Sequence, residues 1–303
     1  MNACRIKILL IGIFVSLNCF AEDFEPTASS NVNFISPYYF GPNACPVPDM
    51  VDEMSKTLKI QLAGDFYKGD RKDKTYDLFL KADIPLFTPH VNLSLWMPVM
   101  EWYKNSTENI NACGIEPQYR ETAKQGHLSG DVYVATNILL LQENKITPIW
   151  TLRAALKTAS GGEYDIRRYY DCAGYFFDTT IAKKFTFSSL PSLWLRFALS
   201  GGFLCWQTDI SKQNDAIMYG AKLALGYSNI SLTGEFGGYS GWQHAPKHEG
   251  ALVYDQPSRF KIDLSWKIKD FSIGAGLCIG VKDYPYKRFQ VGVIYDIDIL
   301  KSK

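Results

Sequence analysis

The chain has 303 residues, of which 14% are aromatic and 21% are charged, and its formal net charge is +1. This composition excludes an intrinsically disordered chain and gives no basic field for nucleic acid, so nucleic acid is not expected as a partner. The mean hydropathy of -0.12 is too polar for a bundle of membrane helices, and no apolar run of about 18 residues follows the first 20 residues.

The chain begins with the pattern of a secretory signal. Two basic residues precede the apolar stretch 8–17, and an A-x-A-like cleavage site ends at Ala21. We therefore expect residues 1–21 to form a signal peptide that is cleaved near Ala21, which delivers the mature chain to an oxidising compartment. A lipoprotein signal at Cys19 is the alternative.

Residues 22–55 follow as a proline-rich segment. The stretch ISPYYFGPNACPVPDM contains four prolines, too many for a helix or a central strand. The segment is long enough to enter a barrel as a plug, with Tyr38, Tyr39 and Phe40 as its apolar part. A disordered periplasmic tail is the alternative, and both interpretations stay open at this point.

The rest of the chain has a hydrophobic pattern of period 2, which indicates strands. Most of these segments have ten to thirteen residues. Globular strands have about five or six residues, and a tilted strand needs about nine to eleven to cross a bilayer. We therefore predict an all-β fold, a single transmembrane antiparallel up-and-down β-barrel of about 12 strands within residues 56–303. The predicted strands are 57–67, 75–87, 91–103, 130–141, 147–158, 170–184, 193–207, 215–227, 230–239, 259–268, 271–282 and 288–299.

The links between these strands alternate between long and short, as in outer-membrane barrels with outside loops and tight periplasmic turns. Only the last outside loop is short, and only one periplasmic turn is long. The predicted outside loops are 68–74, 104–129, 159–169, 208–214, 240–258 and 283–287. The predicted turns are 88–90, 142–146, 185–192, 228–229 and 269–270.

The stretch IWTLRAALKT shows what each face of a strand carries. Trp150 and Leu156 lie on an apolar face, and Arg153 and Lys157 lie on the opposite face. Because a charge at the bilayer midplane costs about 2–4 kcal/mol, we expect the uncharged faces to meet lipid and the charged faces to line the lumen. The predicted lumen residues are Asp131, Arg153, Lys157, Asp178, Arg196, Lys222, Glu235 and Asp263.

Acids and bases are about equally common among these lumen residues, so no strong preference for anions or cations is expected. Arg153, Lys157, Arg196 and Lys222 come from neighbouring strands and are expected to form one basic stripe, with Asp178 between them. The stripe is either a path for a small solute or part of a salt-bridge network, and we favour the network.

The cysteines and histidines give no sign of a metal or a cofactor. Cys45, Cys113, Cys172, Cys205 and Cys278 show no C-x-x-C spacing, and the four histidines show no metal-ligand pattern. We therefore expect no metal and no cofactor, with buried thiols at Cys205 and Cys278. A disulfide between Cys45 and Cys113 is an alternative to free thiols at these positions.

The stretch GHLSGD contains the sharpest enzymatic candidate. His127 and Ser129 are two residues apart and therefore share a strand face, an arrangement that suits a base and its nucleophile in a lipid hydrolase. They also share the parity of Asp131, which places them on the lumen face if the strand extends that far. A polar loop that enters the fourth strand is the favoured interpretation.

The stretches GDVYVATNILLL and ITPIWTLRAALKTASGG resemble the meta-pathway phenol-degradation family, transporter-like outer-membrane barrels distantly similar to fatty-acid transporters. The family's usual Pro-Thr-Gly is replaced by KTASGG, and the chain ends in DIDILKSK where most such barrels end on an aromatic residue. The resemblance implies a transporter-like barrel and leaves the substrate open. The matching residues are Gly130, Asp131, Pro148, Lys157, Thr158, Ser160 and Gly161.

Together these features predict a monomer in the outer membrane of a Gram-negative bacterium. We expect it to contact outer-membrane lipid and lipopolysaccharide and to be inserted by the barrel-assembly machinery. The predicted function is a passive channel or uptake protein for a small solute, hydrophobic solutes included, and not an enzyme. The alternatives are a lipid-modifying hydrolase that uses His127 and Ser129, and a closed structural or surface-interaction barrel.

Overall fold

The computed structural model describes residues 37–86, 88, 90–209, 212–241, 244–246 and 252–298. The predicted signal peptide and residues 22–36 of the proline-rich segment lie outside the described residues. Within the described part, the chain is almost entirely β-structure. The strands of the main sheet are β1 (Leu58–Gly69), β2 (Lys74–Pro85), β3 (Val91–Lys104), β4 (Gln125–Leu128), β5 (Tyr133–Leu141), β6 (Ile149–Lys157), β7 (Gly174–Phe187), β8 (Leu190–Asp209), β9 (Lys212–Tyr227), β10 (Ile230–Gly241), β13 (Ser258–Ile268), β14 (Phe271–Lys282) and β15 (Tyr286–Ile297).

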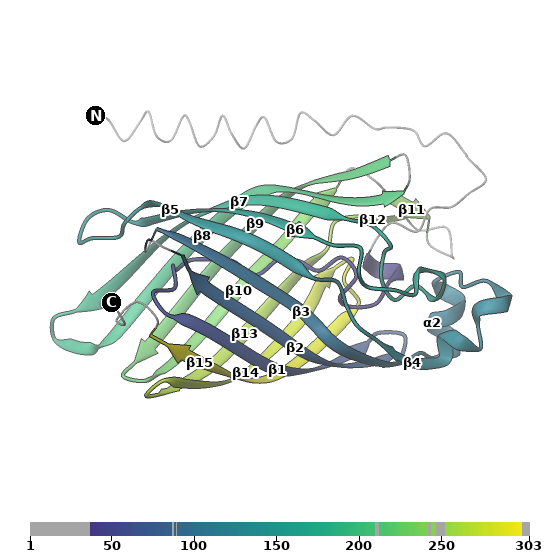
Figure 1. The fold of residues 1–303 in the computed structure, drawn as a ribbon, viewed down its shortest axis with the longest axis horizontal. Helices are drawn as coiled ribbons and strands as arrows, with labels where there is room; N and C mark the ends of the chain where they lie inside the picture. The colour runs from purple at the N-terminus through teal and green to yellow at the C-terminus, as the bar shows by residue number, and fades with distance from the viewer. Residues whose placement is uncertain are drawn as a thin grey trace. The chain divides into compact units, whose positions relative to one another are not determined.

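These strands close into one antiparallel barrel (Figure 1). The long strands pair in chain order, and β1 also pairs with the last strand, β15, so the ring has no free edge. The short β4 and the longer β5 pair with different parts of β3, so the two together occupy one strand position in the barrel wall. Because the ring is closed, each strand has a neighbour on both sides with which its backbone N–H and C=O groups form hydrogen bonds, as a membrane barrel requires. The predicted up-and-down barrel of 12 strands is confirmed, with one extra short strand.

The alternation of side chains along the strands decides which face points outward. On β6, Trp150 and Leu156 are 42% and 61% exposed, whereas Arg153 and Lys157 are 7% and 2% exposed. The apolar face of this strand therefore points outward and the charged face points into the barrel interior, which we call the lumen. The same outward exposure holds for large apolar side chains around the ring, such as Leu62, Leu80, Leu199, Leu223, Leu264, Leu277 and Val291.

The two ends of the barrel differ in their connections. We call the end formed by the described connections 70–73, 105–132, 158–173 and 283–285 the loop end. The opposite end, formed by residues 86, 88 and 90 and by the connections 142–148, 188–189, 228–229 and 269–270, is the turn end.

Several predicted connection lengths are wrong, as two cases illustrate. The loop between β1 and β2 is confined to residues 70–73, because both strands continue beyond the predicted limits. The turn between β7 and β8 is confined to residues 188–189, because Phe187 still pairs with Leu190. Strand pairing therefore extends past the apolar segments from which the limits were predicted.

The loop end also holds small elements that have no period-2 pattern. The helix α2 (Thr107–Ala112) has six residues, too few for an amphipathic stripe. Its first turn is capped by Ser106, whose Oγ accepts a hydrogen bond of 3.0 Å from the Asn109 N–H. No described helix has the length and apolar character needed to cross a membrane. The remaining small elements are η1 (Pro37–Tyr39), η2 (Pro117–Tyr119), η3 (Thr122–Lys124), η4 (Tyr164–Ile166) and a hairpin of β11 (His244–Pro246) and β12 (Leu252–Tyr254).

The five cysteines that follow the predicted signal are all free thiols. Cys45 packs in a cluster with barrel residues such as Tyr133, whereas Cys113 packs in a separate cluster at the loop end. The alternative of a disulfide between Cys45 and Cys113 is therefore wrong. Cys205 and Cys278 are buried, as expected for small thiols inside strands.

Candidate functional site

Residues 37–57, which we call the N-terminal segment, run through the lumen from one end of the barrel to the other. At the loop end, Arg71 Nη1 donates a hydrogen bond of 3.0 Å to the Tyr38 carbonyl. At the turn end, Asn92 Nδ2 donates a hydrogen bond of 3.0 Å to the Ser55 carbonyl. The four prolines keep this segment out of the sheet, so side chains hold it in place.

The part of the N-terminal segment nearer the loop end, which we call its upper part, is fixed by aromatic contacts. Phe40 stacks on Tyr170 of the connection before β7, with ring centroids 3.9 Å apart. The Gly41 N–H donates a hydrogen bond of 2.9 Å to the Arg167 carbonyl. A Cβ at Gly41 would lie 2.6 Å from the Arg168 carbonyl oxygen, so glycine is required for this close approach.

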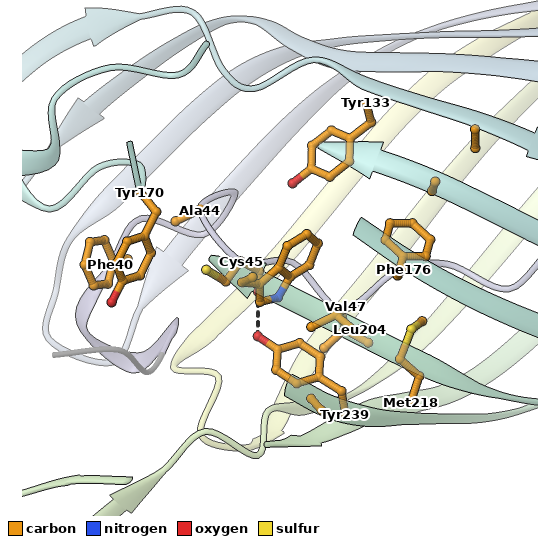
Figure 2. Packing of buried hydrophobic residues seen from close by; sticks show 14 of the residues in the cluster. Phe40, Ala44, Cys45, Val47, Tyr133, Tyr170, Phe176, Leu204, Met218 and Tyr239 are labelled. Atoms are coloured by element: carbon orange, nitrogen blue, oxygen red, sulfur yellow. Dashed lines mark hydrogen bonds between the residues drawn. The ribbon is translucent and has the colours of Figure 1, made fainter. Parts of the chain in front are cut away.

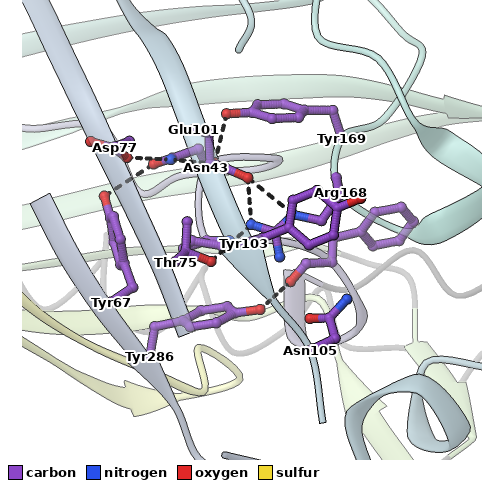
Figure 3. A network of polar contacts seen from close by, with 12 residues as sticks. Asn43, Tyr67, Thr75, Asp77, Glu101, Tyr103, Asn105, Arg168, Tyr169 and Tyr286 are labelled. Atoms are coloured by element: carbon purple, nitrogen blue, oxygen red, sulfur yellow. Dashed lines mark hydrogen bonds and ion pairs between the residues drawn. The ribbon is translucent and has the colours of Figure 1, made fainter. Parts of the chain in front are cut away.

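A buried polar network surrounds Arg168 in the connection before β7 (Figure 3). Arg168 pairs with Glu101 of β3, and its Nη2 donates a hydrogen bond of 2.9 Å to Thr75 Oγ1. Burial is the largest single influence and lowers the pKa of the Arg168 guanidinium, but the charge and hydrogen bond of Glu101, together with Tyr286 and Tyr169, outweigh it and hold the pKa above its ordinary value. The connection before β7 is therefore tied to the wall of the barrel.

Asn43 joins the N-terminal segment to this network. Its Nδ2 donates hydrogen bonds of 2.7 Å to Asp77 Oδ2 and 2.9 Å to Glu101 Oε2. Its Oδ1 accepts a hydrogen bond of 3.0 Å from the Tyr67 hydroxyl. One neutral amide thus satisfies polar groups on β1, β2 and β3.

Below the polar network, the N-terminal segment packs into an apolar cluster (Figure 2). The Tyr239 hydroxyl on β10 donates a hydrogen bond of 3.3 Å to the Cys45 carbonyl. Across the lumen, Trp96 and Tyr133 stack with ring centroids 5.0 Å apart. Figure 2 shows Phe40, Ala44, Cys45 and Val47 of the segment among Tyr133, Tyr170, Phe176, Leu204, Met218 and Tyr239 of the barrel.

The part of the N-terminal segment nearer the turn end, which we call its lower part, is held by ion pairs. Asp49 pairs with Arg259 and Lys261 of β13, and the Lys261 Nζ lies 3.2 Å from Asp49 Oδ2. Asp52 Oδ1 lies 2.7 Å from the Nζ of Lys222 on β9. Arg196 of β8 also pairs with a carboxylate of the segment. Cations of three strands, β8, β9 and β13, therefore bind acids of the N-terminal segment.

Arg196 lies at the centre of this lower region. Its Nη1 donates a hydrogen bond of 2.7 Å to the Asp52 carbonyl, and its Nη2 lies 3.1 Å from Glu53 Oε1. The same Nη2 lies 2.9 Å from Glu143 Oε2 in the connection between β5 and β6. The Arg196 side chain is only 7% exposed, so its charge is neutralised within the protein.

The four cations of the expected basic stripe divide into two pairs. Arg153 pairs with Asp178, which lies directly opposite on β7. The Lys157 Nζ lies 2.6 Å from Asp131 Oδ2, and both side chains are fully buried. Arg196 and Lys222 pair instead with the N-terminal segment. The four cations therefore belong to a salt-bridge network, the alternative favoured from the sequence: wall acids pair with Arg153 and Lys157, and acids of the N-terminal segment pair with Lys222 and, together with Glu143, with Arg196.

The remaining predicted lumen residues also lie on inward positions. Glu235 Oε1 accepts a hydrogen bond of 3.4 Å from the Met50 N–H and lies 3.9 Å from Arg259 Nη2. Asp263 Oδ2 lies 3.2 Å from the Lys261 Nζ. Both acids thus belong to the region that faces the lower part of the N-terminal segment.

The His127 and Ser129 pair does not face the lumen. Both side chains are exposed, and His127 lies opposite Trp102, an outward residue of β3. Their shared parity with Asp131 does not hold, because β4 ends at Leu128 and the backbone is irregular before β5. No hydrogen bond joins His127 to Ser129 within the described residues. The geometry therefore gives no base and nucleophile pair here.

Among the cavities formed by the described residues, two lie beside the N-terminal segment. The upper one has a volume of about 130 Å³ and lies between residues 42–51 and the wall. The lower one, about 550 Å³, opens at the turn end and is lined by charged residues such as Arg196 and Lys269. The described residues contain no cluster of His, Cys, Asp or Glu that could hold a metal ion.

Several residues that hold the N-terminal segment have no recognisable signal in the sequence. Asn43 and Arg168 lie in irregular stretches, where no periodic pattern predicts a neighbour. A signal does exist for the lower contacts, because residues 37–55 contain three acids and no Lys, Arg or His. A short chain of one sign inside a barrel with a charged lumen predicts contact with lumen cations.

No protein-family model and no curated protein matches the chain. Among solved structures, an outer-membrane channel from Pseudomonas putida F1 is similar with a TM-score of 0.56 and 11% identity, over 82% of this chain and 99% of that chain. The porins KdgM and NanC match at 12% identity, over 78% of this chain and 98% of theirs, with TM-scores of 0.48 and 0.46 that are too low to support an inference. The chain therefore shares the barrel fold of the Pseudomonas putida F1 channel.

Proposed function

We propose that this chain is an outer-membrane channel or uptake protein for a small solute, and that the N-terminal segment is its plug. The observation that carries the proposal is the position of residues 37–57, which cross the lumen of a closed barrel from the loop end to the turn end. Wall side chains fill the interior of a barrel of about eight strands, whereas a ring of 12 strands encloses a wider lumen, which the segment occupies here.

The exterior of the barrel supports a location in a membrane. The outward faces carry large exposed apolar residues, as hydrocarbon requires. Trp150, Tyr227 and Trp266 are exposed near the turn end, where interfacial aromatic residues are expected. Together with the signal peptide, these features favour insertion by the barrel-assembly machinery, with the loop end outside and in contact with lipopolysaccharide.

The contacts of the N-terminal segment suit a plug that can leave. Cys45, Cys113, Cys172, Cys205 and Cys278 form no disulfide, so none joins the segment to the wall. Its lower half is held by ion pairs and hydrogen bonds, which exchange with water and salt when the segment moves. The segment continues into β1 at Leu58, so it stays tethered to the barrel after release.

The resemblance to the meta-pathway phenol-degradation family supports a small organic solute. The resembling stretch covers β5 and β6, including the buried pair of Asp131 and Lys157. In this chain the pair ties the start of β5 to the end of β6 at the loop end. We infer that this part of the wall is the element shared with that family.

Conductance across planar bilayers tests this function. We expect deletion of residues 22–55 to raise the conductance of the purified protein, because the lumen loses the chain that crosses it. A matched control, deletion of residues 22–36 only, keeps the described part of the segment and should leave the conductance low. An absence of current in all three forms would remove the channel function and favour a closed structural barrel.

A further inference from the structure

The charged residues of the N-terminal segment are all acids up to residue 55: Asp49, Asp52 and Glu53. Each of them pairs with a cation on the lumen wall, and the cations come from β8, β9 and β13. These cations are Arg196, Lys222, Arg259 and Lys261, which we call the basic patch.

The basic patch is held inside the barrel and not in bulk water. The side chains of Arg196 and Arg259 are 7% and 8% exposed, and those of Lys222 and Lys261 are 19% and 12% exposed. Three wall acids share the region: Glu143, Glu235 and Asp263. The wall alone therefore carries one more cation than acids here, and the segment supplies the carboxylates that occupy the remaining donors.

Other lumen cations have a wall acid as their main partner. Arg153 pairs with Asp178, Lys157 with Asp131, and Arg168 with Glu101. Departure of the N-terminal segment leaves these pairs intact. Within the described residues, the same departure would uncover donors of the basic patch, above all Lys222, whose ion-pair partner is Asp52.

The upper cavity adjoins the basic patch through Arg259, and basic residues outnumber acidic residues in its lining. Its charged lining consists of Lys81, Arg153, Arg259 and Arg288 on the basic side, and of Asp49 and Asp65 on the acidic side. Asp49 belongs to the N-terminal segment, whereas Lys81, Arg153 and Arg288 keep wall acids as partners, so departure of the segment frees Arg259 above all in this space. Arginine forks in such a space match the two oxygens of a carboxylate.

We propose that the basic patch is the solute site of the channel, that it binds small organic anions with a carboxylate or similar group, and that the carboxylates of the N-terminal segment occupy it in the closed state. This inference rests on the proposed channel function and adds the class of solute. An incoming anion would exchange its own contacts for those of Asp49, Asp52 and Glu53. The solute would thereby favour release of the segment that blocks its path.

The test uses the full chain with Asp49→Asn, Asp52→Asn and Glu53→Gln, which weakens the segment contacts without removing a residue. In planar bilayers with a KCl gradient, we expect this variant to conduct with a chloride preference over potassium of about threefold or more. Adding Lys222→Gln and Arg259→Gln should abolish the preference. A control with Lys124→Gln and Glu121→Gln removes one exposed ion pair at the loop end and should leave the selectivity unchanged.

A second measurement identifies the solute class directly. Glucuronate should reduce the chloride current of the triple variant at concentrations about threefold lower than glucose, which has the same ring without the carboxylate. Folding of each variant is checked by the resistance of the unheated barrel to SDS. If the double substitution prevents folding, Lys261→Gln provides a milder variant of the basic patch.

The outcomes separate the two proposals. Current without chloride preference, or a preference unchanged by the patch substitutions, would overturn the anion site and leave the channel function standing. Equal effects of glucuronate and glucose would also overturn it. No current in any variant would overturn both the channel and the solute class.

Discussion

Asp52 offers the sharpest single test of the ion pairs that hold the N-terminal segment. Its Oδ1 lies 2.7 Å from the Lys222 Nζ, and its side chain is 12% exposed. Asp52→Asn keeps the size of the side chain and one oxygen acceptor, and it does not affect the Asp52 carbonyl that accepts from Arg196. The substitution therefore removes charge and little else.

The expected magnitude follows from the contact. A hydrogen bond to a charged group contributes about 1.5–3 kcal/mol, and the lower end applies because asparagine retains an acceptor. A loss of about 1.5 kcal/mol from the closed state raises the ratio of open to closed channels about tenfold, provided the open state has no Asp52 contact of similar strength.

Single-channel recording measures this ratio as open probability. The matched control is Asp171→Asn in an exposed part of the connection before β7, which should leave the open probability unchanged. An Asp52→Asn barrel that is folded and opens no more often than the parent chain would refute the role of this ion pair in closure.

Three further results are expected. Gly41→Val should raise the conductance severalfold, because its Cβ would meet the Arg168 carbonyl oxygen at 2.6 Å and force the segment out of its position; an unchanged current would contradict this. Burial raises the pKa of the Cys172 thiol to about 11, so the thiolate fraction at pH 8 is about one in a thousand. The rate of Cys172 alkylation, measured by mass spectrometry, should therefore rise about tenfold per pH unit up to about pH 11. A plateau of this rate near pH 9 would show an ordinary thiol. His127→Ala and Ser129→Ala should leave conductance unchanged, and the parent protein should not hydrolyse phospholipid, since both residues are exposed and not bonded to each other; hydrolysis lost on substitution would contradict the channel interpretation.

The barrel itself could be predicted from the sequence because lipid imposes a simple rule on every strand. An uncharged face on alternate residues identifies a membrane strand whatever its neighbours are, as Trp150 and Leu156 on β6 illustrate. The limits of the strands are less predictable, because pairing continues where the lipid constraint has ended. Phe187 and Leu190 at the short turn between β7 and β8 show this effect.

The interior was predictable only in part. The parity of Arg153 and Lys157 places their side chains inward, but the partners that neutralise them come from other strands and from the start of β5. The contacts of Asn43 and Arg168 were beyond prediction, because irregular segments have no period from which a neighbour can be inferred. The break before β5 likewise reversed the expected direction of His127.

The most direct measurement compares the currents of the intact mature chain and the chain without residues 22–55 in the same bilayer and at the same voltage. A plugged pore predicts steady current after the deletion and rare openings before it. Equal currents in the two forms, with both barrels folded, would contradict closure by the N-terminal segment.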